Sequence, residues 1–196
     1  MSRDLRICFI GDSYINGTRD ETFLGWTGRV CASRRHSGID LTSYSLGIRR
    51  NTSTDIRARW QAEARLRLPP TCEGRLVFSF GVNDCFLEAD RLRVPIADSM
   101  ANAQHILTTA SAWLPTLVVG PPPVASVPGQ GAINQRIATY SAALRRLCAE
   151  RQVPFIDVCT PLRDDPLWAA DLDGDGAHPT SLGYERLAQV ILSNPA

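Results

Sequence analysis

The chain has 196 residues, of which 44% are hydrophobic and 21% charged, and its formal net charge is +1. These values are typical of a soluble globular protein, and we expect a single domain over residues 1–196. The near-neutral charge gives no reason to expect a nucleic-acid partner. All 21 basic residues are arginines, which excludes Schiff-base, pyridoxal-phosphate and Walker-type lysine chemistry within this chain.

Targeting signals and disulfides are not expected either. The apolar run at residues 7–10 is too short for the core of a signal peptide, and no window of 18 residues is apolar enough to span a membrane. The six cysteines are scattered and none forms a C-x-x-C pair. We therefore expect reduced thiols in a cytoplasmic protein that does not bind membranes.

Short apolar runs alternate along the chain with helical patterns. In chain order, the runs that predict strands are residues 6–10 (RICFI), 40–46 (DLTSYSL), 75–80 (RLVFSF), 116–119 (TLVV) and 153–158 (VPFIDV). Apolar residues at spacings of three and four predict helices over residues 96–110, 133–147 and 184–191. A further helix is expected over residues 54–68, although arginines blur its apolar stripe.

Such alternation is typical of an α/β fold, because parallel strands need crossover connections that helices supply. The pattern predicts one five-stranded parallel sheet with helices on both faces. In open sheets of this kind, the functional site lies beyond the carboxyl ends of the strands. The residues that directly follow each strand are therefore the candidates for chemistry.

Polar residues follow four of the five predicted strands. Ser13 lies in the sequence GDSY after the first strand, Gly47 follows the second, and Asn83 lies in GVND after the third. After the fifth strand and before the last helix come Asp175 and His178, three residues apart. We expect these residues to meet at one edge of the sheet.

This set of residues is what acyl transfer requires. Serine becomes a good nucleophile when a histidine takes its proton, and a carboxylate holds that histidine in the correct tautomer. We assign Ser13 as the nucleophile, His178 as general base and acid, and Asp175 as its orienting carboxylate. The oxyanion donors would be the backbone N–H groups of Ser13 and Gly47 and the side-chain amide of Asn83.

Four blocks of the sequence resemble the SGNH, or GDSL-type, hydrolases. They are FIGDS, SLGIRRNT, FGVND and DGAHPTSLGY, which occur in the order of that family between residues 9 and 184. The resemblance implies a three-layer α/β/α flavodoxin-like fold and hydrolysis of small-molecule esters or thioesters without a cofactor or metal. It implies the same roles for the serine, glycine, asparagine and histidine. Tyr14 and Val82 depart from the leucine and threonine common in that family, which bears on the pocket more than on the mechanism.

Three other residues are candidates for substrate binding. Tyr14 adjoins the serine, and Arg49, with its neighbour Arg50, lies just beyond Gly47, where it could meet an anionic group of the substrate. Trp168 either walls the acyl pocket or belongs to the core. The sequence does not indicate the acyl-chain length, the leaving group or the oligomeric state.

The stretch DLDGDGAHPTSLGY at residues 171–184 allows competing interpretations. As a calcium loop it has carboxylates at positions one, three and five, but Leu182 stands where the bidentate glutamate is needed. As a haloacid-dehalogenase-type motif it lacks a preceding buried strand. Asp171 and Asp173 remain alternatives to Asp175 as partner of His178.

Two further alternatives concern the class of protein. A non-catalytic flavodoxin-like module could bind a phosphate or flavin in the loop 13–18, although this would leave Asn83 and the Asp-x-x-His pair unexplained. An acyltransferase could use the same acyl-enzyme. The other two histidines, His36 and His105, are expected at the surface.

Overall fold

The computed structural model describes residues 3–33, 38–125 and 129–194, so His36 lies outside the described part. Its strands are β1 (Arg3–Gly11), β2 (Ile39–Gly47), β3 (Glu73–Ser79), β4 (Leu87–Glu88), β5 (Arg91–Leu92), β6 (Thr116–Val119) and β7 (Phe155–Ile156). Its helices are α1 (Ser13–Asn16), α2 (Gly25–Ser33), α3 (Ser53–Arg65), the 3₁₀ turn η1 (Asn83–Cys85), α4 (Ile96–Ser111), α5 (Ile133–Glu150), α6 (Cys159–Arg163), α7 (Pro166–Asp171) and α8 (Ser181–Leu192).

Five parallel strands form the central sheet in the order β2-β1-β3-β6-β7. This is the flavodoxin-like order, in which the direction of winding reverses beside the first strand. The predicted fold class is confirmed. The reversal places the ends of β1 and β3 at the natural position for a site.

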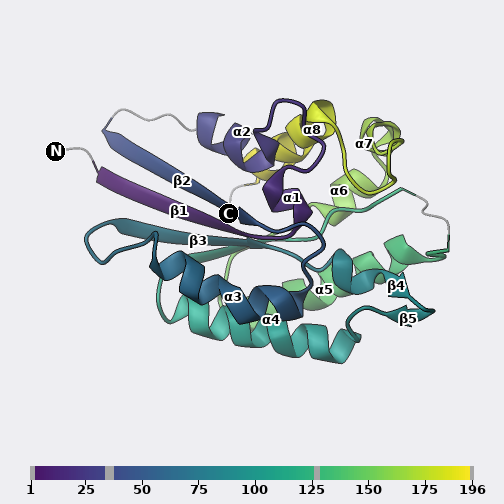
Figure 1. Cartoon of the computed structure of the whole chain (residues 1–196), viewed down its shortest axis with the longest axis horizontal. Coiled ribbons are helices and arrows are strands. Elements are labelled where there is room, and N and C mark those ends of the chain that lie inside the picture. The colour runs from purple at the N-terminus through teal and green to yellow at the C-terminus, as the bar shows by residue number, and fades with distance from the viewer. Residues whose placement is uncertain (1–2, 34–37, 126–128, 195–196) are drawn as a thin grey trace.

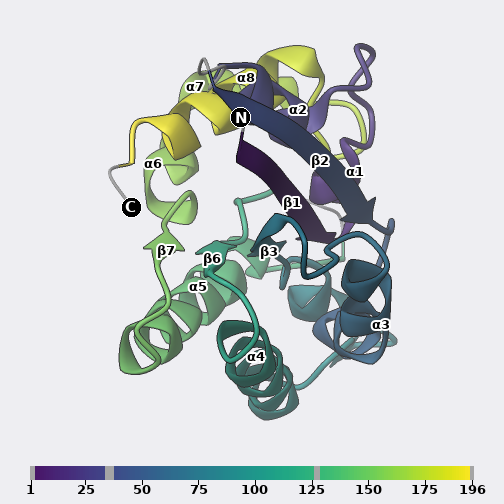
Figure 2. The same cartoon turned by 90° about the vertical axis from the view of Figure 1, so that its left-hand side faces the viewer.

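Helices cover both faces of the sheet (Figures 1 and 2). Helices α2 and α8 pack together on one face, with α1, α6 and α7 on the same side, while α3, α4 and α5 cover the other face. The strands all point toward α1 and the small β4–β5 hairpin (Figure 1). That end of the molecule is the carboxyl edge of the sheet.

The helices that border this edge are fixed by local capping. Asp12 precedes α1 and its carboxylate accepts a hydrogen bond from the backbone N–H of Tyr14 at 3.0 Å. Thr52 and Asp55 form a reciprocal capping box at the start of α3. These caps fix the starts of α1 and α3, so the short segments that join them to β1 and β2 stay at the carboxyl edge of the sheet.

The β4–β5 hairpin was not predicted from the sequence. Its turn residues Ala89 and Asp90 both have positive φ, 49° and 58°, as a two-residue turn between antiparallel strands requires. Neither is a glycine or asparagine, so the usual sequence signal of such a turn is missing. Strand β7 (Phe155–Ile156) is also shorter than the predicted residues 153–158, and it pairs with β6 at Val118 and Val119.

The interior of the domain is apolar, and all six cysteines are free thiols. Burial raises the pKa of the Cys8, Cys85 and Cys148 thiols to about 12, so these thiols stay protonated near neutral pH. No helix in the described part of the chain combines the length and apolar character needed to cross a bilayer.

Candidate active site

Ser13 is the first residue of α1 and lies at the end of β1, with only 4% of its surface exposed. The preceding Asp12 anchors this turn through its bond to the Tyr14 N–H. The chain thus turns sharply from strand to helix at Ser13. The serine hydroxyl therefore lies at the carboxyl edge of the sheet, as the sequence predicts.

A continuous chain of close contacts joins the serine to a histidine and a carboxylate. His178 Nε2 lies 2.7 Å from Ser13 Oγ, and His178 Nδ1 lies 2.7 Å from Asp175 Oδ2. Ser13 and His178 are 165 residues apart in sequence. The fold alone brings them together, by placing the loop before α8 beside the end of β1.

The carboxylate of Asp175 is held in its ionised form. Its partial burial alone would raise its pKa, but hydrogen bonds from the His178 ring and from the backbone N–H groups of His178 and Ala177 outweigh that effect. The pKa of Asp175 is lowered to about 2. Asp175 is therefore negatively charged at neutral pH. Its charge faces the His178 ring and stabilises the imidazolium when it forms.

The loop that carries the histidine is fixed from two sides. The Tyr14 hydroxyl donates a hydrogen bond to the carbonyl oxygen of Ala177, and the N–H of Ala125 donates to the carbonyl of Gly176 at 2.8 Å. The Tyr14 ring also lies against the His178 ring, with centroids 5.7 Å apart. Tyr14 is 2% exposed, so its hydroxyl supports the histidine loop.

Asn83 comes to the same edge from the end of β3. Its amide nitrogen lies 3.0 Å from the carbonyl oxygen of Asn51 and 3.3 Å from Asp12 Oδ2. Burial raises the pKa of Asp12 to about 7, and the nearby Asp84 carboxylate adds to this, against the hydrogen bond from the Tyr14 N–H. The amide of Asn83 and the turn at Ser13 are therefore tied to one buried carboxyl group.

Gly47 lies at the end of β2, opposite Gly11 at the end of β1. It is not among the residues that line the cavity around Ser13, although Arg49 and Arg50 are. A β carbon at Gly47 would collide with the backbone nitrogen of Asn16. Glycine is needed there because β2 passes closely against α1, and the role of its N–H as an oxyanion donor stays a prediction.

A cavity of about 320 Å³ surrounds the serine and histidine. Its wall includes Ser13, Tyr14, Asn83, Asp175 and His178 from the predicted set. Five residues that the sequence did not indicate also line it: Phe86, Leu87, Glu88, Arg93 and Gln130. Leu87 and Glu88 belong to the β4–β5 hairpin, and Phe86 and Arg93 adjoin it. The only sequence signal for this hairpin was a short alternating segment around the Ala-Asp pair.

Trp168 is not a wall of this cavity. It is 1% exposed, and its indole N–H donates to the carbonyl oxygen of Pro123 at 3.0 Å. Of the two roles considered for this residue, the structure selects the core. A rigid aromatic side chain there holds α7 against the segment that follows β6.

Asp171 and Asp173, the two alternatives to Asp175 as partner of His178, lie in different surroundings. Asp171 accepts hydrogen bonds from the N–H groups of Thr180 and Gly183 at 2.7 and 2.9 Å, at the start of α8. Asp173 is exposed. Asp171 ends the helix α7 and does not follow a strand, which contradicts the phosphatase interpretation. Among the described residues, no group of three or more His, Cys, Asp or Glu side chains is arranged to hold a metal ion.

Comparison with known proteins identifies the family. The model of the GDSL-like lipase/acylhydrolase family matches residues 9–186. The chain belongs to this family. As a GDSL hydrolase it is an enzyme that hydrolyses ester bonds and acts on small-molecule esters, so the non-catalytic alternative is wrong.

Solved structures share the fold of this GDSL hydrolase at low identity. The acetylxylan esterase Axe2 of Geobacillus stearothermophilus has a TM-score of 0.77 at 19% identity, over 97% of this chain and 94% of its own. A lipase/acylhydrolase of Enterococcus faecalis has a TM-score of 0.74 at 21% identity, over 98% and 94%. A lipolytic G-D-S-L protein of Veillonella parvula has 0.73 at 17%, over 96% of each chain. A search of curated proteins found no match.

Proposed function

We propose that this GDSL hydrolase cleaves carboxylic esters through an acyl-enzyme on Ser13, with His178 as general base and acid and Asp175 as the carboxylate that orients it. The observation that carries the proposal is the pair of 2.7 Å contacts that joins Ser13 Oγ to His178 Nε2 and His178 Nδ1 to Asp175 Oδ2. These distances lie within hydrogen-bond reach, as proton transfer from the serine requires.

The reaction follows from these contacts. His178 Nε2 takes the hydroxyl proton as Ser13 Oγ attacks the ester carbonyl, and the resulting imidazolium is stabilised by the ionised Asp175. The tetrahedral intermediate collapses as His178 gives its proton to the departing alcohol oxygen. Water then enters, His178 takes its proton, and the acyl group leaves as a carboxylic acid with Ser13 restored.

The oxyanion of the tetrahedral intermediate needs donors that are already in place. We assign the backbone N–H of Ser13 and the side-chain N–H of Asn83 to this role. Without substrate, the Asn83 amide nitrogen donates to the Asp12 carboxyl and the Asn51 carbonyl, so one of its hydrogens has to turn to the oxyanion. Ser13 and Asn83 both line the cavity, and both come from the ends of adjacent strands, β1 and β3. The backbone N–H of Gly47 is the third predicted donor, at the end of β2 beside the end of β1, although Gly47 is not among the residues that line the cavity.

The cavity favours small, polar esters. Its volume of about 320 Å³ is near the lower end of the range for ligand pockets. The exposed Arg49 and Arg50 line its mouth, and we assign to them the binding of an anionic group on the substrate. The fold is shared with an acetylxylan esterase, which agrees with a short acyl group.

The test combines activity with covalent labelling. Wild type and Ser13→Ala are assayed on p-nitrophenyl esters and on thioesters of graded chain length, and both are treated with a fluorophosphonate. We expect hydrolysis to fall by at least about 10³-fold in Ser13→Ala, because the nucleophile is removed. Mass spectrometry should find the phosphonate on the peptide that contains Ser13 in wild type.

A matched control is Ser193→Ala, because Ser193 is an exposed serine at the end of α8 and does not line the cavity. This variant should keep wild-type hydrolysis and labelling. Full activity in Ser13→Ala would overturn the mechanism, and so would labelling at another serine. A chain-length optimum beyond about six carbons would contradict the proposed short acyl group.

A further inference from the structure

Arg93 is a charged residue of the catalytic cavity that no motif of the family includes. It directly follows β5 and is largely buried, with 16% of its side chain exposed. One terminal nitrogen lies 3.2 Å from Asn83 Oδ1, and the other lies 2.9 Å from the carbonyl oxygen of Arg50. The guanidinium therefore joins the loop after β3 to the loop after β2.

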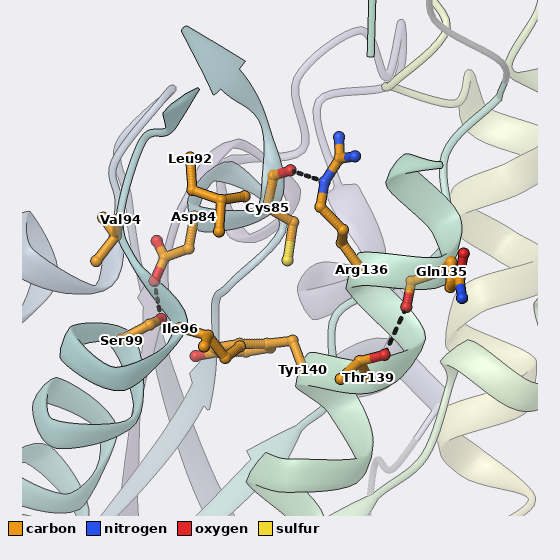
Figure 3. Close-up of a pocket in the computed structure, with 10 residues that line it drawn as sticks. All are labelled: Asp84, Cys85, Leu92, Val94, Ile96, Ser99, Gln135, Arg136, Thr139 and Tyr140. Carbon is orange, nitrogen blue, oxygen red and sulfur yellow. Dashed lines mark hydrogen bonds between the residues drawn. The ribbon is translucent and has the colours of Figure 1, made fainter. Parts of the chain in front are cut away.

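Successive side chains at residues 92–94 face two different cavities, and that of Arg93 faces the catalytic one. Leu92 and Val94 line a second cavity of about 330 Å³ (Figure 3), whereas Arg93 between them lines the catalytic cavity. Such alternation is what extended backbone imposes. Arg93 therefore faces the catalytic cavity because its two apolar neighbours, Leu92 and Val94, face the other one.

The hairpin itself is anchored to α5. Arg136 Nε donates to the carbonyl oxygen of Cys85 at 2.8 Å (Figure 3), just before the hairpin begins. Gln130 brackets Leu87, accepting from its N–H at 2.7 Å and donating to its carbonyl at 3.1 Å. These bonds hold the hairpin in place, so the position of Arg93 is fixed by the fold.

The contact with Asn83 decides which way its amide faces. A guanidinium can only donate hydrogen bonds, so it fixes the side-chain oxygen of Asn83 toward itself and turns the side-chain nitrogen away. The nitrogen then lies 3.3 Å from Asp12 Oδ2, in the turn that carries Ser13, and 3.0 Å from the carbonyl oxygen of Asn51. The cation also polarises the amide, which strengthens its N–H as a donor.

The positive charge of Arg93 has no close carboxylate partner among the described residues. Its nearest carboxylate in the described part of the chain is that of Glu88, at 4.0 Å and with 69% of the Glu88 side chain exposed. Water screens so exposed a partner strongly. The carboxyls of Asp55 and Asp84 also interact with its charge at longer range, so the closest polar contacts of the guanidinium are the Asn83 side-chain oxygen and the Arg50 carbonyl.

We propose that Arg93 is a positioning residue of the oxyanion site: it orients and polarises the Asn83 amide and locks the Arg50 carbonyl in place. This inference rests on the proposed role of Asn83 as an oxyanion donor. Arg93 acts through Asn83 and does not touch the ester. Its loss should lower kcat and leave KM for neutral esters nearly unchanged.

The test uses Arg93→Gln and Arg93→Lys, with Arg91→Gln as the matched control. Arg91 lies on the same hairpin, pairs with Glu88 across it, is exposed and lines neither cavity. With p-nitrophenyl acetate, a neutral ester, we expect Arg93→Gln to lower kcat by about 10- to 100-fold, the range for a lost hydrogen bond to a charged group. Arg93→Lys should recover part of this loss, and Arg91→Gln should match wild type.

A double-mutant cycle with Asn83→Ala separates the possible outcomes. If Arg93 acts through Asn83, adding Arg93→Gln to Asn83→Ala should lower kcat by less than about 2-fold, because the amide is already gone. Fully additive effects would overturn the inference, as would a loss confined to the KM of anionic esters. Thermal unfolding and fluorophosphonate labelling confirm that each variant is folded with a reactive Ser13.

The two proposals fail in different ways. If Asn83→Ala keeps wild-type kcat, the oxyanion role of Asn83 is wrong and the inference falls with it. If Asn83→Ala lowers kcat but Arg93→Gln and Arg93→Lys both match wild type, only the inference on Arg93 is wrong. Neither result affects the assignment of Ser13, which its own variant tests.

Discussion

Two aspartates lie near Ser13 and His178, and the fold shifts their pKa values in opposite directions. Asp12 follows β1, is 1% exposed, and burial raises its pKa to about 7. Asp175 lies in the loop before α8 with 32% of its side chain exposed, and its hydrogen bonds lower its pKa to about 2. Near neutral pH, Asp175 beside His178 is therefore fully ionised, whereas Asp12 beside Asn83 is partly protonated.

The difference shows that sequence proximity to the serine does not decide which carboxylate takes part in the chemistry. Asp12 is adjacent to Ser13 in sequence, but its oxygens are committed to the Tyr14 N–H and the Asn83 amide. Asp175 is 162 residues from Ser13 and faces the imidazole. We assign a structural role to Asp12 and the stabilisation of the imidazolium to Asp175. Four experiments test these roles and those of the residues around them.

The largest effect is expected at Asp175. Asp175→Asn should lower kcat by about 10⁴-fold, because an amide can hold His178 in the wrong tautomer and cannot stabilise the imidazolium. Asp173→Asn should leave kcat unchanged, and Asp171→Asn should cost about 1 kcal/mol of stability at the start of α8. Steady-state kinetics and urea unfolding measure these effects. A large fall in kcat in Asp173→Asn with activity kept in Asp175→Asn would reverse the assignment.

At Asp12 the expected effect is on stability and its dependence on pH. Because its pKa is raised from 3.8 to about 7 in the folded state, its stabilising contribution is complete below pH 3.8 and is lost as the pH rises through 7. The unfolding free energy of wild type relative to Asp12→Asn should therefore fall between pH 4 and pH 8, by up to about 4 kcal/mol. Urea unfolding at several pH values measures it, with Asp173→Asn as the control. If the difference in unfolding free energy between wild type and Asp12→Asn does not change with pH, the pKa of the Asp12 carboxyl is not raised in the folded state.

A smaller effect is expected at Tyr14. Tyr14→Phe keeps the ring beside His178 but removes the hydroxyl that donates to the Ala177 carbonyl. We expect stability to fall by about 1–2 kcal/mol and kcat by about 10-fold or less, because the histidine loop loses one support. Urea unfolding and kinetics on p-nitrophenyl acetate measure both changes. A rise in KM with unchanged kcat and stability would instead favour substrate contact, the role that the sequence suggested for Tyr14.

The smallest effect is expected at the mouth of the cavity. Replacing both Arg49 and Arg50 with Gln should raise KM for an ester with a carboxylate or phosphate group by about 3- to 10-fold, because each exposed arginine contributes little through solvent. KM for p-nitrophenyl acetate should stay the same. Added salt should reduce the wild-type preference for the anionic ester. Equal losses on neutral and anionic esters would contradict the anionic-substrate assignment.

Much of the fold was predictable because its signals are local. Continuous apolar runs at β1, β3 and β6 indicated buried parallel strands, and stripes at spacings of three and four indicated α4, α5 and α8. The helix α2 and the hairpin β4–β5 were missed. The turn of that hairpin has positive φ at Ala89 and Asp90 without glycine, and the segment of α2 has too little apolar periodicity to stand out.

The candidate site was predictable to the extent that each residue lies directly after a strand or in a short motif. Ser13, Asn83, Asp175 and His178 all line the cavity. Gly47 and Trp168 do not, and for both residues the sequence left more than one role open. A glycine can serve close packing as well as donate, and a tryptophan can fill the core as well as a pocket, and only the neighbours across the fold distinguish these uses.

The sequence by itself determined the alternating architecture, the family and the four residues that meet at the edge of the sheet, because periodicity and short motifs are properties of the chain. Only the tertiary structure decided which carboxylate is ionised beside the histidine, where Gly47 and Trp168 lie, and that Arg93 faces Asn83. Those properties depend on burial and on contacts across the fold, such as those of Trp168 with Pro123 and of Gly47 with Asn16. Such contacts exist only once the sheet has brought the ends of β1, β2 and β3 and the loop before α8 to one edge.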